Sequence, residues 1–98
     1  GALTEKNFEA IRADMAFLGV DAISAEGDLL TTGMETARLS ELIMSVSRHT
    51  VLLADSSKFG AQAPVRYGAL SDIEMVVSDK GLTECAVVRD AGCGLILV

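Results

Sequence analysis

The segment His49-Thr50-Val51-Leu52-Leu53-Ala54-Asp55-Ser56-Ser57-Lys58-Phe59-Gly60 combines an apolar run with an abrupt polar end. Residues 50–54 are almost entirely apolar, which is typical of a strand buried on both faces of a parallel sheet. The run stops at an acid, two hydroxyl residues, a cation and a glycine. Ligands bind beyond the carboxyl ends of strands in open parallel sheets, so this segment predicts both a central strand and a binding loop.

The polar loop after this strand carries the side chains of a candidate ligand site. Lys58 supplies a mobile positive charge that suits a phosphate group. Ser56 and Ser57 supply hydroxyls, the loop supplies backbone N–H groups, and Asp55 can accept hydrogen bonds from substrate hydroxyls. The same composition also makes an ordinary turn, so these residues alone leave both interpretations open.

Length and charge limit the classes of protein to which the chain can belong. With 98 residues, it is expected to form one domain at most. Its net charge of −6 argues against nucleic-acid binding by this chain itself and against binding to an acidic membrane surface. The apolar runs are too short to cross a bilayer and no secretory leader is visible, so we expect a cytoplasmic protein.

The cysteines and the single histidine do not suggest a metal or a cofactor. Cys85 and Cys93 lie in apolar surroundings without a CxxC spacing, which predicts two buried free thiols in a reducing compartment. His49 stands at the entrance of a strand without a cluster of further metal-ligating residues. We therefore predict no metal site and no cofactor.

The first half of the chain alternates between helical and strand patterns. Thr4 is a suitable N-cap for a short helix that is predicted to end near Ala13. A buried strand is predicted over residues 15–20 and an exposed loop over 21–31, and the longest helix is predicted over 33–47.

The longest predicted helix has an apolar stripe at helical spacing. This stripe predicts a core-facing side made of Leu39, Leu42, Ile43 and Val46. Met34 and Met44 are predicted to fill the core rather than to form a Met-rich binding surface.

The second half of the chain continues the alternation. An extended loop over 61–68 contains Tyr67, which we expect at the surface. A strand is predicted over 73–77, a helix over 82–91 with Gly92 as its C-terminal stop, and a last strand over 94–98. This order predicts an α/β fold with an open, mostly parallel sheet and flanking helices.

Three predicted strands are followed by an acidic residue at the same edge of the sheet. These residues are Asp21, Asp55 and Asp79, and Gly19 lies just before the first of them, where it permits close approach of a ligand or another element. Such an edge is where we expect chemistry. Aspartates also cap turns and helices, and for Asp79 we favour that structural role.

Three segments resemble the C-terminal effector domain of DeoR-type transcriptional repressors. They are Ala13-Asp14-Met15-Ala16-Phe17-Leu18-Gly19, then Leu52 to Gly60, then Leu70-Ser71-Asp72-Ile73 with Ser78-Asp79 and Leu82. The family usually has threonine where Ser78 stands. The resemblance implies the sugar-phosphate isomerase fold, a phosphorylated sugar effector, and a helix-turn-helix DNA-binding domain that is absent from this chain. It also implies that the chain is the C-terminal part of the effector domain, without the first strands and part of the phosphate-binding loop.

The same fold contains ribose-5-phosphate isomerase, and the differences from that enzyme bear on catalysis. The enzyme's Asp-Gly-Ala-Asp-Glu motif corresponds here to Leu18-Gly19-Val20-Asp21-Ala22, so two of its three acids are replaced by apolar residues. Its general-base glutamate falls near Ser40, with Glu41 one residue away. Isomerisation needs such a base, so the resemblance implies a chain that binds without turnover.

These observations predict a ligand-sensing, non-catalytic domain of a regulator of sugar metabolism, in a molecule expected to be a homo-oligomer. The predicted ligand-binding residues are Gly19, Asp21, Asp55, Ser56, Ser57 and Lys58. Two alternatives stay open at this point. One is a sugar-phosphate isomerase-like enzyme, and the other is a structural or oligomerisation fragment whose open sheet edge pairs with another chain.

Overall fold

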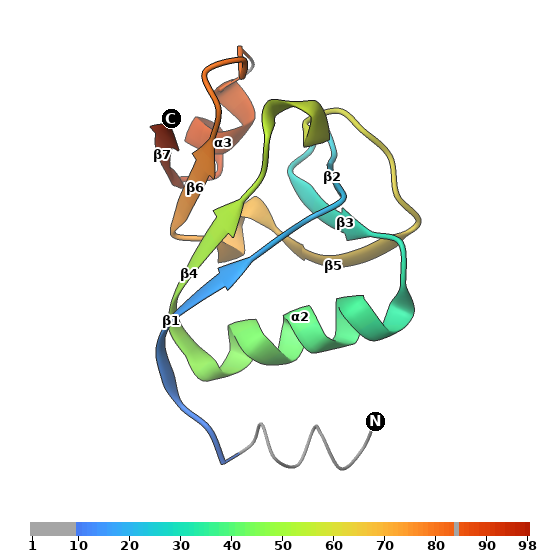
Figure 1. The fold of residues 1–98 in the computed structure, drawn as a ribbon, viewed down its shortest axis with the longest axis vertical. Helices are drawn as coiled ribbons and strands as arrows, with labels where there is room; N and C mark the ends of the chain where they lie inside the picture. Colours follow the sequence, from blue (N-terminus) through green and yellow to red (C-terminus); the bar gives the residue numbers. More distant parts are fainter. Residues whose placement is uncertain (1–9, 84) are drawn as a thin grey trace.

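The computed structural model describes residues 10–83 and 85–98, and these form two sheets that share one core (Figure 1). The first sheet has four strands in the order β1-β4-β6-β7, and the second has three in the order β2-β3-β5. The helix α2 (Met34–Val46) packs against both sheets.

The four-stranded sheet is entirely parallel, as the alternation of elements predicted. Its strands are β1 (Ala13–Leu18), β4 (Ser47–Leu53), β6 (Met75–Ser78) and β7 (Gly94–Leu97). β4 pairs with β1 on one side and with β6 on the other. The prediction that residues 50–54 form a central strand is therefore confirmed, although the regular strand ends at Leu53.

The prediction of strands buried on both faces is only half correct. Thr50, Val51 and Leu52 of β4 are buried, but Leu53 is 48% exposed. In β1, Met15 and Phe17 are 52% and 62% exposed. The physical reason is that these exposed side chains lie on the face of the sheet opposite to α2 and the second sheet, where no described element packs.

α2 begins after Gly33, as predicted, but it is rotated relative to the predicted apolar stripe. Its buried residues are Ala37, Ser40 and Val46. Of the predicted stripe, Val46 is buried and Ile43 packs against the core as predicted, whereas Leu39 is 42% exposed. Small side chains face the sheets and let the helix approach them closely. Met34 is exposed, so its assignment to the core is wrong, whereas Met44 packs against the core as predicted.

The remaining helices depart from the predicted bounds. α3 (Ala86–Asp90) is shorter than the predicted 82–91, and Gly92 follows it with φ +82°, the left-handed conformation of a helix stop. The N-terminal helix was predicted mainly on residues 1–9, which lie outside the described residues. Its predicted end at Ala13 is wrong, because β1 begins there.

The second sheet is a feature that the sequence patterns did not predict. It consists of β2 (Ala22–Ile23), β3 (Asp28–Thr31) and β5 (Val65–Ala69), paired antiparallel in segments expected to be loops. Its side chains are among the most buried, and Tyr67 is 3% exposed rather than at the surface. The second sheet encloses one side of the core, where Ile23 and Leu29 pack in the same cluster as Leu52 of β4 and Val76 of β6.

Candidate functional site

Three loops meet at the carboxyl edge of the four-stranded sheet, as the parallel order requires. They follow β1, β4 and β6 and carry Asp21, Asp55 and Asp79 respectively. The loop after β4 forms the short 3-10 helix η1 (Ser56–Lys58). We call these three loops the rim. Hydrogen bonds, and to a smaller extent the charge of Lys58, lower the pKa of both Asp21 and Asp55.

Asp55 fixes the first turn of η1. Its carboxylate accepts a hydrogen bond from the Ser57 amide at 2.9 Å and another from the Ser57 hydroxyl. These bonds, with the nearby charge of Lys58, hold the pKa of Asp55 below its ordinary value. Asp55 is therefore ionised at neutral pH and has lone pairs left for a ligand hydroxyl.

Asp79 links the loop after β6 to η1. It accepts from the Ser56 amide at 2.6 Å, from the Ser56 hydroxyl at 2.9 Å and from the Gly81 amide at 2.8 Å. These bonds lower its pKa. A Cβ at Gly81 would lie 2.7 Å from the Asp79 carboxylate, so this turn requires a glycine. The structural role favoured for Asp79 is what the contacts show.

Asp21 connects the rim to the second sheet. Its carboxylate accepts from the Thr31 hydroxyl at 2.8 Å and from the Thr32 amide at 2.9 Å, just before α2 begins. These bonds, and then the charge of Lys58, lower the pKa of Asp21. Asp21 is exposed and ionised, with capacity to accept a further hydrogen bond.

The backbone amides of the η1 loop are paired within the chain, contrary to the expectation that the loop would offer backbone N–H groups to a ligand. The amides of Ser56 and Ser57 donate to carboxylates, and those of residues 58–61 donate to backbone carbonyls. Both serine hydroxyls also donate to carboxylates. The physical reason is that the tight turn satisfies its own donors. Ser56 and Ser57 can therefore only accept from a ligand.

Lys58 is the one donor group of η1 that remains available. It is half-buried, and its ammonium makes no hydrogen bond or ion pair with residues 10–83 or 85–98. Gly19 lies exposed at the start of the rim, with open space where a side chain would be. Its carbonyl accepts a hydrogen bond from the Tyr67 hydroxyl at 2.6 Å, so the second sheet also fixes this loop.

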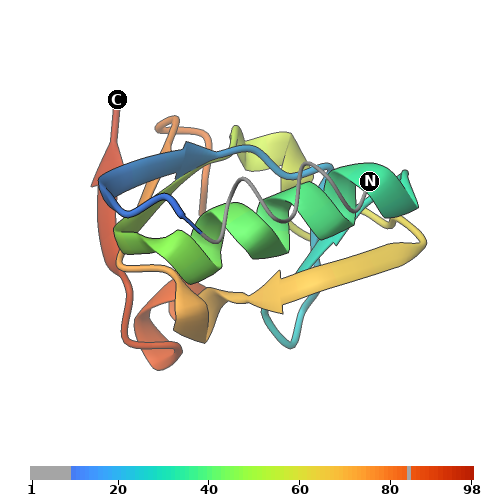
Figure 2. The same cartoon turned by 90° about the horizontal axis from the view of Figure 1, so that it is seen from below.

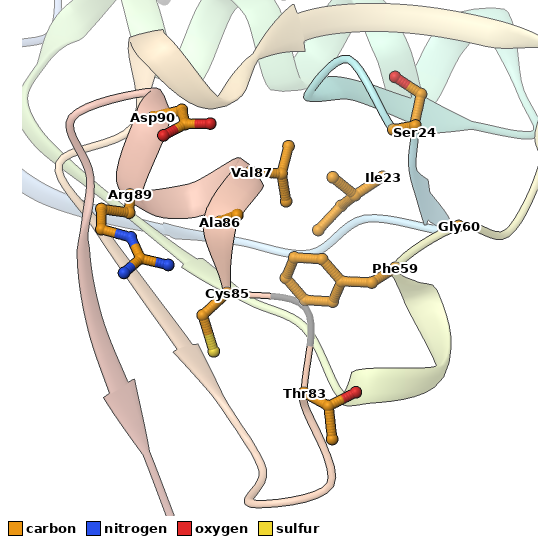
Figure 3. Close-up of a pocket in the computed structure, with 11 residues that line it drawn as sticks. Ile23, Ser24, Phe59, Gly60, Thr83, Cys85, Ala86, Val87, Arg89 and Asp90 are labelled. Atoms are coloured by element: carbon orange, nitrogen blue, oxygen red, sulfur yellow. The ribbon is translucent and has the colours of Figure 1, made fainter.

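A cleft of about 470 Å³ opens beside η1 and was not foreseen from the sequence (Figure 3). Its apolar lining includes Phe59, Ile23 and Val87 of α3. None of the six predicted ligand-binding residues lines this cleft. The only sequence signal for this cleft is that Phe59, which lines it, directly follows Lys58, one of the predicted ligand-binding residues.

The structure also locates the residues considered for catalysis and metal binding. Ser40, where the isomerase base was expected to fall, is buried on α2, and Glu41 is exposed. Within residues 10–83 and 85–98, no three His, Cys, Asp or Glu side chains are arranged to hold a metal. His49 pairs with Glu74 at 2.7 Å. Both cysteines are free as predicted, but each is half-buried rather than buried.

Neither α2 nor α3, the helices in the described part of the chain, is long and apolar enough to cross a membrane.

Comparison with known proteins now identifies the family. The sequence model of the DeoR C terminal sensor domain matches residues 1–80. The glycerol-3-phosphate regulon repressor of Haemophilus influenzae is 42% identical over 74 residues, which cover 76% of this chain and 29% of that protein. The chain spans about a third of the length of such curated relatives.

Two further relatives agree with this result. The HTH-type transcriptional regulator GlpR of Haloferax volcanii is 33% identical, and the glycerol-3-phosphate regulon repressor of Escherichia coli K12 is 34% identical. Each match covers 81% of this chain and 31% of the relative. The mostly parallel α/β sheet is the sugar-phosphate isomerase-like arrangement expected from the resemblance. The chain belongs to the family of DeoR C-terminal sensor domains.

Proposed function

We propose that the rim of this chain contributes to the effector site of a transcriptional regulator of sugar metabolism, and that it binds a phosphorylated sugar or a related metabolite. One observation carries the proposal. The Lys58 ammonium has no hydrogen-bond or ion-pair partner among the described residues, and its loop lies at the carboxyl edge of a parallel sheet together with the loops of Asp21 and Asp55.

The rim offers complementary chemistry to such a ligand. Lys58 attracts the phosphate, and Asp21 and Asp55 accept from sugar hydroxyls. Ser56 and Ser57 accept through their remaining lone pairs, and the open space beside Gly19 admits the ligand. Glycerol 3-phosphate, which occurs in the names of two relatives, belongs to this class of phosphorylated polyols.

The charge balance indicates that the rim is only part of the site. The rim carries the carboxylates of Asp21, Asp55 and Asp79 but only the ammonium groups of Lys58 and Lys80, and the amides of the η1 loop are already paired. A phosphate dianion therefore needs further donors, which we assign to the polypeptide outside residues 1–98. In this proposal, residues 1–98 are the C-terminal part of the effector domain.

DNA binding is assigned to a helix-turn-helix domain elsewhere in the full protein. Two observations support this assignment: the relatives are about three times as long as the match, and this chain carries a net charge of −6. The effector would act by a population shift, because it binds one arrangement of the rim more tightly than another. The full regulator would be a cytoplasmic homo-oligomer.

We further propose that the chain binds its ligand without turning it over. The relatives named here are transcriptional regulators and repressors. Ser40 offers no carboxylate, and its side chain is buried on α2. Incubation with ribose 5-phosphate should give no ketose above the level of a protein-free control. Formation of ketose that depends on Glu41 would show an enzyme instead.

Titration calorimetry with a panel of phosphorylated sugars, and with their unphosphorylated forms, tests the proposal. The panel is applied to the 98-residue chain and to a chimera in which this chain replaces the matched segment of the Escherichia coli glycerol-3-phosphate regulon repressor. Lys58→Ala should weaken the binding of the phosphorylated ligand by about ten-fold or more, because a charged hydrogen bond is lost. Arg48→Ala, which removes the same charge from an exposed position at the start of β4, at the opposite end of that strand from the rim, should leave it unchanged.

Two outcomes would contradict the proposal. One is an equal effect of the Lys58 and Arg48 substitutions, which would indicate a general charge effect rather than a site. The other is the absence of binding by any phosphorylated sugar to the chain and to the chimera. A bound ligand at 100 times its dissociation constant stabilises a protein by about 2.7 kcal/mol, so thermal unfolding provides an independent readout.

A further inference from the structure

The three carboxylates of the rim differ in how many of their oxygen atoms the protein itself occupies. Asp79 uses both, because Oδ1 accepts from the Ser56 amide and Oδ2 accepts from the Ser56 hydroxyl and the Gly81 amide. Within residues 10–83 and 85–98, every hydrogen bond to Asp21 goes to Oδ2 and every hydrogen bond to Asp55 goes to Oδ1. Asp21 and Asp55 therefore each keep one oxygen open to a donor from a ligand.

The occupied oxygen of Asp21 is held by the two residues at the end of β3. It accepts from the Thr31 hydroxyl at 2.8 Å, from the Thr32 amide at 2.9 Å and from the Thr32 hydroxyl at 3.3 Å. The Asp21 amide donates to the Leu30 carbonyl at 2.9 Å, so the main chain is fixed to the same strand. The carboxylate cannot rotate without breaking these bonds, and the open oxygen Oδ1 consequently has a fixed direction.

Thr31 is the buried member of this group. It is 3% exposed, whereas Thr32 is exposed. Buried hydroxyls require a hydrogen-bond partner, and Thr31 donates its proton to a carboxylate of the rim. This bond is the largest of the effects that lower the pKa of Asp21. The position of the hydroxyl is in turn set by the pairing of Thr31 with Val65 of β5.

The second sheet holds the loop after β1 at a further point. Figure 2 shows β5 beside α2, on the side of the helix away from β1. From β5, the Tyr67 hydroxyl donates to the Gly19 carbonyl at 2.6 Å, two residues before Asp21. Thr31 and Tyr67 are each only 3% exposed and offer no surface to a ligand. Any part they play in binding must act through Gly19 and Asp21.

We infer that Thr31 is a positioning residue, whose hydroxyl aims the open oxygen of Asp21 so that this carboxylate selects an effector presenting a hydroxyl there and rejects one presenting a carboxylate. The inference rests on the proposed function, because it needs Asp21 to face the ligand. A fixed, ionised acceptor binds a hydroxyl donor, whereas a second carboxylate has no proton to donate and is repelled. Asp55, which Ser57 fixes in the same way, would accept from a second hydroxyl.

NMR titration of the Asp21 carboxyl in the 98-residue chain tests the positioning without a ligand. Thr31→Val removes the hydroxyl and keeps the shape of the side chain, and Thr31→Ser keeps the hydroxyl. Thr31→Ala is a second variant without the hydroxyl, in case Thr31→Val does not fold, and it places no methyl group against the carboxylate. Thr50→Val is the matched control, because Thr50 is also buried, at 5% exposure, but lies within β4.

The inference predicts that the pKa of Asp21 rises towards 3.8 in Thr31→Val and Thr31→Ala, because the bond that lowers it most is lost. The pKa should keep its wild-type value in Thr31→Ser and Thr50→Val. An Asp21 pKa that is the same in wild type and in both variants without the hydroxyl would overturn the inference.

Calorimetry on the chimera with the Escherichia coli repressor tests the selectivity. The probes are inorganic phosphate, glycerol 3-phosphate, which occurs in the name of that repressor, and 3-phosphoglycerate, which has a carboxylate in place of one hydroxymethyl group. Thr31→Val should weaken the binding of glycerol 3-phosphate by about five-fold or more, because a hydrogen bond to the ligand is misaligned. It should leave the binding of inorganic phosphate unchanged and reduce the preference for glycerol 3-phosphate over 3-phosphoglycerate. Thr31→Ser should restore the wild-type preference.

The failures of the inference and of the proposed function are distinguishable in this experiment. Wild-type affinity and preference in a Thr31→Val chimera that binds glycerol 3-phosphate would overturn the inference alone. A wild-type chimera that binds none of the three probes would overturn the proposed function, and the inference with it.

Discussion

The Asp79 carboxylate accepts hydrogen bonds from both the amide and the hydroxyl of Ser56, at 2.6 and 2.9 Å. This pair ties the loop after β6 to the loop after β4, across two adjacent parallel strands. The position of Lys58 therefore depends on an acid that need not touch a ligand. Asp79 is best regarded as a positioning residue for the rim.

The Asp79–Ser56 pair predicts a pH-dependent stability. Its hydrogen bonds lower the pKa of Asp79 from the ordinary value of 3.8, so the folded state favours the carboxylate. The stabilisation is complete above pH 3.8 and is lost as the pH falls through the lower folded-state pKa. Asp79→Asn should lower the free energy of unfolding at neutral pH, and the difference from wild type should shrink below pH 3.8. Urea unfolding over a series of pH values measures this.

Asp14→Asn serves as the control for that series. Asp14 is exposed on β1 and lies far along the strand from the rim, so its substitution should change stability little at any pH. An Asp79→Asn variant with the same pH profile as wild type would show that the pair does not stabilise the fold.

Tyr67→Phe tests the link between the second sheet and the loop at Gly19. Removing the hydroxyl leaves the Gly19 carbonyl without its 2.6 Å donor and should cost about 1 kcal/mol. Burial, and then the charge of Asp21, raises the pKa of Tyr67 to about 12. The neutral phenol therefore stabilises the fold below pH 10, and this contribution is lost as the pH rises from 10 towards 12.

Tyr67 is the only tyrosine and the chain has no tryptophan, so the ultraviolet absorbance of the phenolate reports this one group. The folded chain should titrate well above pH 10, and the chain in denaturant near its ordinary value. A folded-state titration near pH 10 would indicate that Tyr67 is accessible to water.

Leu29→Ala tests whether the second sheet belongs to the cooperative core. Leu29 is fully buried on β3, so truncation should lower the free energy of unfolding by about 2–5 kcal/mol. Leu39→Ala removes the same atoms from a side chain that is 42% exposed and should change stability by only about 0.5 kcal/mol. Chemical unfolding of both variants gives the comparison, and equal losses would show that the second sheet folds apart from the core.

The strands of the parallel sheet and the start of α2 were predictable because their signals are local. An apolar run such as residues 50–54 needs only its own side chains to indicate a buried strand. The polar loop at Asp55 and Lys58 followed from the same segment, since a strand end sets the position of what comes after it.

The second sheet was not predictable, because its signals are short and non-local. β2 has only two residues. β3 pairs with β5, which is separated from it in the sequence by α2 and β4, and the register shifts between Leu29 and Leu30. The Gly68 within β5 further weakens its strand pattern. The exposure of Phe17 on β1 was also not predictable, because an apolar residue indicates burial whether its own chain or another molecule covers it.

The internal pairing of the η1 amides bears on whether ligand binding changes the conformation of the rim. A loop whose donors are already satisfied gains no order when a metabolite arrives, so little binding free energy is spent on freezing it. The rim would therefore act as a rigid unit rather than as a loop that folds on binding. Binding of the metabolite would then change the position of the rim as a rigid body relative to the rest of the regulator.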